Sequence, residues 1–172
     1  SLFDEQELTV NACYDYLRKA VMRLMSRNKN IHVVVTVSPI RYRKYGYHGS
    51  QLSKATLLLA AEKLAKEVHI DYFPAYEIMN DELRDYRFYK EDMLHPTHQA
   101  VEYIWERFAK TYFSNDVFTM MSEWKPIKEA LNHRPFDCES EEYKAFIKNI
   151  MEKEKAFREK YKASPTTTLP RK

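Results

Sequence analysis

Apolar residues recur every three or four positions in several segments, which is the spacing of one face of an α-helix. This spacing predicts four long helices, at residues 9–26, 50–67, 97–112 and 140–162. The last of them carries Glu and Lys opposite its apolar side, so we expect the apolar stripe to pack against the same domain or a partner. Shorter helical patterns follow at 77–85 and 116–124, and Pro126 is expected to start a new helix.

Two runs of β-branched and aromatic residues, at 31–37 and 69–73, predict β-strands. The first is apolar almost throughout, which is typical of a strand that is covered on both faces in a parallel sheet. Together with the helix expected at 50–67, the two runs predict a strand–helix–strand crossover. The sequence therefore predicts an α/β fold, in which polar residues beyond the strand ends lie where open α/β sheets bind ligands.

The sequence changes character after Ser114, where helical patterns replace the alternation of strands and helices. We expect residues 1–113 to form the α/β domain. Residues 114–162 are expected to form a helical extension packed on it, with a non-helical corner at 132–136. The tail at 163–172 is rich in Pro and Thr and is expected to be disordered.

The composition argues against cofactor chemistry. The 172-residue chain contains only two glycines, so it has no Gly-rich phosphate loop, no G-x-S-x-G turn and no dinucleotide-binding fingerprint. Its two cysteines, Cys13 and Cys138, lie far apart without metal-ligand spacing, which favours two reduced thiols over a metal site or a disulfide. We therefore expect no cofactor and no metal.

The charge pattern argues against nucleic acid as a partner. The net charge is only +3, and Lys and Arg are interleaved with Asp and Glu on most expected helices, as on a solvated surface. No apolar run approaches the roughly 20 residues that span a bilayer, so we expect no membrane span. The oligomeric state and the compartment stay open, with the cytoplasm favoured.

The most informative polar motif is Asp92-x-x-His95, which directly precedes Pro96 and an expected helix start. In one tight turn, the carboxylate can accept a hydrogen bond from the imidazole Nδ1–H and leave Nε2 free to take a proton from a hydroxyl nucleophile. The alternatives are a solvated turn or a helix cap. Metal-dependent hydrolysis by Asp92, His95 and His98 is a further alternative, but no second acidic cluster is evident.

Three more polar residues are candidates for substrate or oxyanion binding, namely Ser38, Arg41 and His48. Ser38 ends an expected strand, but Pro39 follows it and has no backbone N–H to hold an oxyanion, so we expect a structural or substrate-positioning hydroxyl. Arg41 offers fixed donors to an acyl oxygen, a carboxylate or a phosphate. The alternative for this arginine is a salt bridge to an acidic residue, namely Asp85, Glu91 or Asp92. His48 is a candidate for the mouth of the pocket.

Several ordered motifs resemble the GSCFA family of bacterial proteins. They are TVSPIR at 36–41, QLSKA at 51–55, YFPAYEIM at 72–79, DELRDYRFY at 81–89, DMLHP at 92–96 and ALNHRPF at 130–136. The last of these resembles that family's C-terminal extension, and the likeness spans residues 9–162. Where the family often has histidine after its S-P-x-R core, this sequence has Tyr42.

The GSCFA family is similar to a branch of the SGNH hydrolases, which are three-layer α/β/α esterases, lipases and deacetylases. The resemblance implies a partial SGNH-like, flavodoxin-like parallel sheet with a C-terminal helical extension. It also implies that His95 is the general base and Asp92 its orienting partner. The family's nucleophilic serine belongs to a Gly-Ser-Cys-Phe-Ala motif near its N-terminus, which this sequence lacks, so the chain resembles a C-terminal portion that is inactive alone.

We therefore expect the C-terminal part of a serine hydrolase that acts on an ester or O-acyl group of a small molecule or carbohydrate. Its nucleophilic serine would come from upstream of Ser1. The alternative is a noncatalytic module in which the aromatic and Arg-rich loop at 41–47 binds a carbohydrate or a protein.

Overall fold

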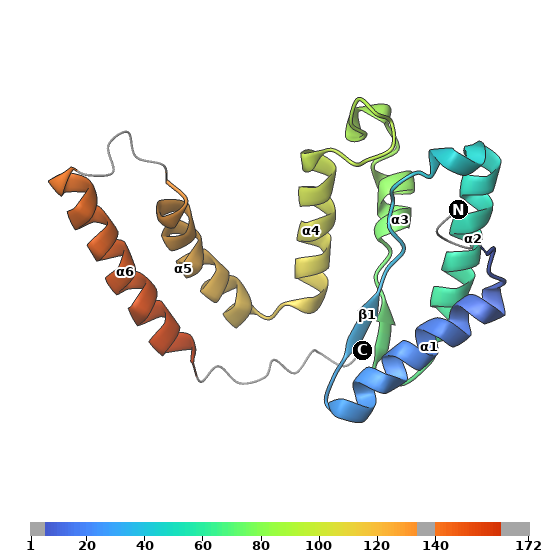
Figure 1. Cartoon of the computed structure of the whole chain (residues 1–172), viewed down its shortest axis with the longest axis horizontal. Helices are drawn as coiled ribbons and strands as arrows, with labels where there is room; N and C mark the ends of the chain where they lie inside the picture. The colour runs from blue at the N-terminus through green and yellow to red at the C-terminus, as the bar shows by residue number, and fades with distance from the viewer. Residues whose placement is uncertain (1–5, 134–139, 163–172) are drawn as a thin grey trace. The chain divides into compact units, whose positions relative to one another are not determined.

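The computed structural model describes residues 6–133 and 140–162, and the chain divides into two compact units, 1–108 and 109–172. The elements of the first unit are, in chain order (Figure 1), α1 (Val10–Arg27), β1 (Val33–Val35), η1 (Arg43–Tyr45), α2 (Gly46–Leu64), β2 (Ile70–Tyr72), α3 (Ala75–Glu77), η2 (Ile78–Glu82), η3 (Tyr86–Phe88) and most of α4 (His98–Tyr112). The second unit holds the end of α4, then α5 (Asn115–Leu131) and α6 (Glu141–Tyr161). The expected boundary after residue 113 stays a prediction, and the expected tail lies outside the described residues.

Three of the expected long helices are confirmed as α1, α4 and α6. Helices α1 and α6 have side-chain caps at their N-termini. Thr9 Oγ1 accepts a hydrogen bond from Ala12 N, and Ser140 Oγ accepts one from Tyr143 N, both at 3.2 Å. Among the described helices, none is both long enough and apolar enough to cross a membrane.

Two other helical segments differ from their expected form. Helix α2 begins at Gly46 rather than near residue 50. The segment expected to be a helix at 77–85 starts as α3 and continues as the π-helical η2, in which Leu83 N donates to Ile78 O at 2.9 Å. Apolar spacing alone does not distinguish such a wider turn from an α-helix.

The expected three-layer α/β/α fold is wrong. The described residues contain one sheet of two parallel strands, with Val33 opposite Ile70 and Val35 opposite Tyr72. The expected crossover through α2 is therefore present, but β1 has only three residues, which are half-buried rather than covered on both faces. Pro74 has no N–H for pairing beyond β2, and the other elements of residues 6–133 and 140–162 are helices, so the described chain supplies no third strand.

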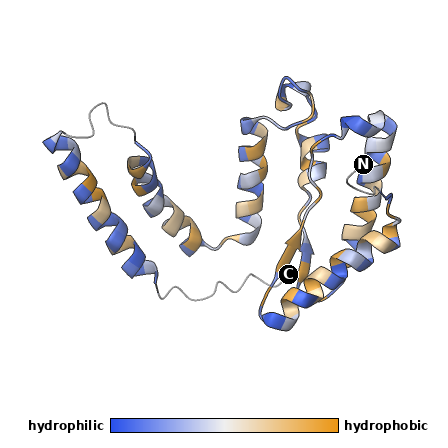
Figure 2. Cartoon of the chain, in the orientation of Figure 1, coloured by the Kyte–Doolittle hydropathy of each residue, from blue (hydrophilic) through white to orange (hydrophobic). Residues whose placement is uncertain are grey.

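Two hydrophobic clusters form the core of the first unit. The first joins Val21 of α1, Leu64 of α2 and Ile70 of β2, and Val33 and Val35 of β1 pack against it. Since alternate strand residues share a face, α1 and α2 cover one face of the sheet, whose β1 strand Figure 2 shows as hydrophobic. The second cluster joins η2, the following loop and α4 through four buried residues, namely Met79, Leu83, Tyr89 and Ala100.

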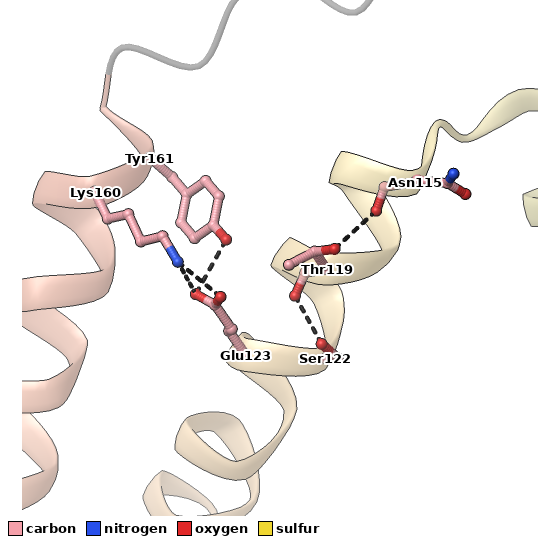
Figure 3. A network of polar contacts seen from close by, with 6 residues as sticks. All are labelled: Asn115, Thr119, Ser122, Glu123, Lys160 and Tyr161. Atoms are coloured by element: carbon pink, nitrogen blue, oxygen red, sulfur yellow. Dashed lines mark hydrogen bonds and ion pairs between the residues drawn. The ribbon is translucent and has the colours of Figure 1, made fainter.

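In the second unit, α5 packs against α6. The rings of Trp124 and Phe157 lie 5.0 Å apart. Lys160 Nζ donates to both carboxylate oxygens of Glu123 at 2.7 Å and Tyr161 Oη donates to one of them at 3.0 Å (Figure 3), which lowers the pKa of the Glu123 carboxyl. The apolar side of α6, visible in Figure 2 as hydrophobic positions between hydrophilic ones, thus packs within its own unit.

Helix α5 continues through Pro126, so the expected start of a new helix at this residue is wrong. A proline inside a helix removes a backbone hydrogen bond and costs about 3 kcal/mol. The neighbouring Ile127 is buried, and with Ile150 of α6 it lines a small groove between the two helices. Tertiary packing of this kind stabilises a helix more than local propensity does.

We expect Leu64→Ala to lower the free energy of unfolding by about 2–5 kcal/mol, because Leu64 is completely buried in the first cluster and alanine leaves a cavity there. Urea unfolding followed by circular dichroism measures the change. The matched control is Leu59→Ala on the same helix, where the side chain is 58 % exposed and the expected change is within about 0.5 kcal/mol. Equal losses in the two variants would contradict the assignment of this core.

Candidate active site

The Asp-x-x-His motif lies in a tight loop between η3 and α4. Tyr89 and Pro96 form an antiparallel bridge, and Lys90 N donates to His95 O at 2.8 Å, so the loop is closed at its base. At its tip, Met93 takes a left-handed conformation with φ of 59°, which reverses the chain. This backbone conformation brings the side chains of Asp92 and His95 together.

Asp92 is held by three hydrogen bonds. Its Oδ1 accepts from Leu94 N at 2.8 Å and from His95 N at 3.0 Å, and its Oδ2 lies 2.6 Å from His95 Nδ1. The N–H donors of His95 and Leu94 hold the pKa of the Asp92 carboxyl well below its usual range. An ionised carboxylate can only accept, so His95 Nδ1 carries the proton and Nε2 has a free lone pair in the neutral ring.

The pair is accessible to solvent. The His95 side chain is 51 % exposed and that of Asp92 is 42 % exposed. No other group among the described residues is seen to hydrogen-bond to His95 Nε2, so this nitrogen is open to an incoming hydroxyl or water. The hydrogen bond expected from the spacing is present, whereas the catalytic role of the pair stays a prediction.

A pocket of about 770 Å³ lies beside this loop within the first unit. Its walls come from the segment after β1, the first half of α2, the α3–η2 segment and the Asp-x-x-His loop, through residues that include Arg41, Gln51, Lys54, Tyr76, Asn80, Tyr89 and Asp92. His95 itself is outside the lining, and so are the candidates Ser38 and His48. Of the residues predicted from sequence, the structure thus brings Arg41 and Asp92 together in one cavity wall.

Arg41 connects the segment after β1 to the Asp-x-x-His loop. Its N–H donates to Leu94 O at 3.1 Å, and its guanidinium carbon lies 3.9 Å from the ring centre of Tyr89 and 5.5 Å from that of Tyr86. Within the described part of the chain it forms no ion pair, and Asp85 pairs with Arg87 instead. The alternative of a salt bridge from Arg41 is therefore wrong, because aromatic faces occupy the guanidinium.

The side chains of Ser38 and His48 are not part of the pocket lining. Ser38 is exposed, and its Oγ accepts only a long hydrogen bond of 3.4 Å from Ile40 N, which is a local turn contact. Its carbonyl oxygen accepts a hydrogen bond of 2.6 Å from Lys54 Nζ. His48 lies exposed on α2. The backbone of Ser38, rather than its hydroxyl, contributes to the site.

Lys54 is a pocket residue that sequence reasoning missed. It is only 7 % exposed, and burial lowers the pKa of its ammonium group. A signal was present in the sequence, because Lys54 precedes Ala61 by two helical turns and therefore shares the buried face of its helix. A lysine in an apolar stripe indicates a buried charge.

A metal centre finds no support in this geometry. Across residues 6–133 and 140–162, no group of three His, Cys, Asp or Glu side chains is arranged to hold a metal ion. His98 is directed to Glu102 on its own helix, with Nε2 3.8 Å from Oε1. The structure therefore does not bring Asp92, His95 and His98 together as joint ligands.

We expect Asp92→Asn to lower the free energy of unfolding at pH 7 and to lose this effect in acid. The folded protein favours the ionised Asp92, so its contribution is complete above the ordinary aspartate pKa of about 3.9 and disappears as the pH falls through the lower pKa of the folded state. Urea unfolding at several pH values measures the difference between variant and parent.

Asp15→Asn is the matched control for this pH series, since Asp15 is exposed on α1. It should produce a smaller loss of stability at pH 7, because exposed substitutions usually change stability little. An Asp92→Asn difference that is the same at pH 7 and at about pH 2 would show that the carboxylate charge does not stabilise the loop.

Comparison with known proteins gives two family matches. The chain matches the GSCFA family over residues 1–108, which is more than half of its length, and the C-terminal domain of GSCFA domain proteins over residues 124–167. Comparisons with curated proteins and with solved structures give no match. The family match contains the whole pocket and the Asp92–His95 pair, and it confirms the resemblance: the chain belongs to the GSCFA family.

Proposed function

We propose that this chain supplies the acid/base pair of a serine hydrolase that cleaves an ester or O-acyl group, with Asp92 and His95 as the pair. The observation that carries the proposal is the 2.6 Å contact between Asp92 Oδ2 and His95 Nδ1. Two backbone N–H groups hold the other oxygen of Asp92, so a fixed carboxylate orients the imidazole. The likeness of this motif to the Asp-x-x-His block of the SGNH hydrolases supports the same roles.

In the proposed reaction, His95 Nε2 takes the proton of a serine hydroxyl while the serine oxygen attacks the acyl carbon. Asp92 stabilises the imidazolium that forms. The imidazolium then gives its proton to the leaving alcohol oxygen as the ester C–O bond breaks, which leaves an acyl-serine. Water attacks this acyl-serine, His95 takes one proton from it and passes that proton to the serine oxygen, and the carboxylic acid is released.

The nucleophilic serine is proposed to come from a segment of the protein other than residues 1–172. Ser38 is a poor candidate, because it is exposed, lies outside the pocket lining and precedes Pro39, which has no N–H to hold an oxyanion. By resemblance, the serine belongs to the family's Gly-Ser-Cys-Phe-Ala motif. We therefore expect the chain by itself to show no ester turnover.

The pocket beside the loop is the proposed site for the substrate. Asp92 and Leu94 belong to its wall, so a ligand in the cavity lies next to the loop that carries the acid/base pair. Its volume of about 770 Å³ is within the range of small-molecule sites. A small-molecule or carbohydrate ester is the substrate class that fits this size.

A noncatalytic carbohydrate-binding module is the second candidate function. The observation in its favour is the parallel stacking of Tyr42 on Tyr45, with ring centres 5.6 Å apart, next to the pocket that Tyr42 lines. Such aromatic faces bind ligands without any need for an acid/base pair. A binding module of this kind would show no ester turnover, and removal of the His95 imidazole would leave its ligand binding unchanged.

We expect His95→Ala in the full-length protein to lower kcat for ester hydrolysis by about 10²- to 10⁴-fold, because the proton acceptor is removed. Its matched control is His98→Ala, since that side chain is 89 % exposed on α4 and lies outside the pocket lining. Hydrolysis of a chromogenic acetyl ester measures the rate, and circular dichroism checks the fold.

Two results would decide against the hydrolase. One is an unchanged rate in folded His95→Ala protein. The other is a full-length protein that neither turns over esters nor reacts with a serine-directed fluorophosphonate probe, which would favour the binding module.

A further inference from the structure

Lys54 is a buried cation without a carboxylate partner. It is the one charged residue of the described chain that is buried, at 7 % exposure, and it lies in the wall of the pocket. Its Nζ donates to the Ser38 carbonyl oxygen at 2.6 Å and lies 5.8 Å from the ring centre of Tyr76. Within residues 6–133 and 140–162, no carboxylate is seen within ion-pair distance of this nitrogen.

An isolated buried ammonium group is unfavourable unless it is paired. The group has three N–H donors, and the Ser38 carbonyl occupies one of them. Burial already lowers the pKa of Lys54, which is the direction expected when no anion balances the charge. An anionic ligand in the pocket would supply the missing acceptor oxygens.

The other charges of the pocket do not neutralise Lys54. Its wall carries three cationic residues and two acidic ones, namely Arg41, Arg43, Lys54, Glu91 and Asp92. The carboxylate of Asp92 is already committed to three N–H donors on its own loop. The balance of charge in the wall therefore favours an anion over a neutral or cationic ligand.

The remaining wall near Lys54 suits a ligand rich in hydroxyl groups. Tyr76 Oη donates to Gln51 Oε1 at 2.9 Å, so the side-chain amide of Gln51 is oriented and its NH₂ group keeps both donors. Both residues line the pocket with Lys54. A few oriented polar groups among aromatic side chains are typical of small-molecule sites that set the orientation of a ligand.

We propose that Lys54 binds a carboxylate group of the ligand, and that the ligand of this pocket is an acidic sugar. The inference rests on the proposed function only in taking the pocket as the substrate site. Taken together, the proposed hydrolase and the proposed acidic-sugar site define the substrate of the full-length protein as an O-acylated sugar that carries a carboxylate. Binding of the acidic sugar does not require hydrolysis, so the two proposals are tested separately.

Titration of the 172-residue chain with D-glucuronate, followed by NMR, tests the proposal, with D-glucose as the neutral comparison. We expect glucuronate to bind more tightly than glucose. Lys54→Met should weaken glucuronate binding by at least about tenfold, because a hydrogen-bonded charge pair is lost. The matched control is Lys66→Met, where the side chain is 72 % exposed and lies outside the pocket lining, and it should leave binding unchanged.

Equal binding of glucuronate and glucose, or equal binding of glucuronate by the parent and Lys54→Met, would overturn the proposal. Tighter binding of inorganic phosphate than of glucuronate would overturn the choice of a carboxylate. If Lys54→Met loses its circular dichroism signal, spectra of the unsubstituted chain with ¹³C-labelled lysine decide the matter. A shift of the Lys54 side-chain resonance by glucuronate supports the proposal, and no shift overturns it.

The proposed hydrolase is judged by a different measurement. Full-length protein that binds glucuronate through Lys54 but cleaves no ester would contradict the hydrolase and leave the acidic-sugar site intact. Full-length protein that cleaves neutral esters through His95 but does not bind glucuronate would contradict the acidic-sugar site and leave the hydrolase intact.

Discussion

The candidate site depends on the contact between Arg41 and the Asp-x-x-His loop. The first unit has two separate hydrophobic clusters, one around α1, α2 and the sheet and one around η2 and α4. Arg41 follows the strand of the first cluster, donates its N–H to Leu94 and places its guanidinium on Tyr89, which belongs to the second cluster. The segment after β1 and the Asp-x-x-His loop both line the pocket, so its shape depends on the contact between them.

The two charges that matter most in this pocket are stabilised in different ways. Asp92 stays ionised because three N–H donors surround it on an otherwise exposed loop. Lys54 is removed from water with a single backbone acceptor, so its ammonium form is disfavoured. The first arrangement fixes the orientation of the His95 imidazole, and the second leaves N–H donors of Lys54 that we propose an anionic ligand fills. The two proposals thus give Asp92 and His95 a role in proton transfer and Lys54 a role in ligand binding.

Several features followed from local sequence because the interactions that produce them are local. Helices α1 and α6 begin where Thr9 and Ser140 offer a side-chain cap, and the apolar spacing gives their length. The Asp92–His95 contact joins residues three apart in one turn, so it could be expected without knowledge of the rest of the fold. Pro126 shows the limit of such reasoning, since the packing of α5 on α6 outweighs a local helix breaker.

The sequence by itself determined the positions of α1, α4 and α6, where the two strand-like runs lie, and that an aspartate and a histidine meet in a loop. These outcomes depend on backbone hydrogen bonds and side-chain contacts between near neighbours. Only the tertiary structure decided that the sheet stops at two strands, that Arg41 rests on tyrosine rings and that Lys54 lines a pocket. Strand pairing, ring stacking and burial join residues far apart in the chain, and apolar spacing indicates that a residue is buried without indicating its partner.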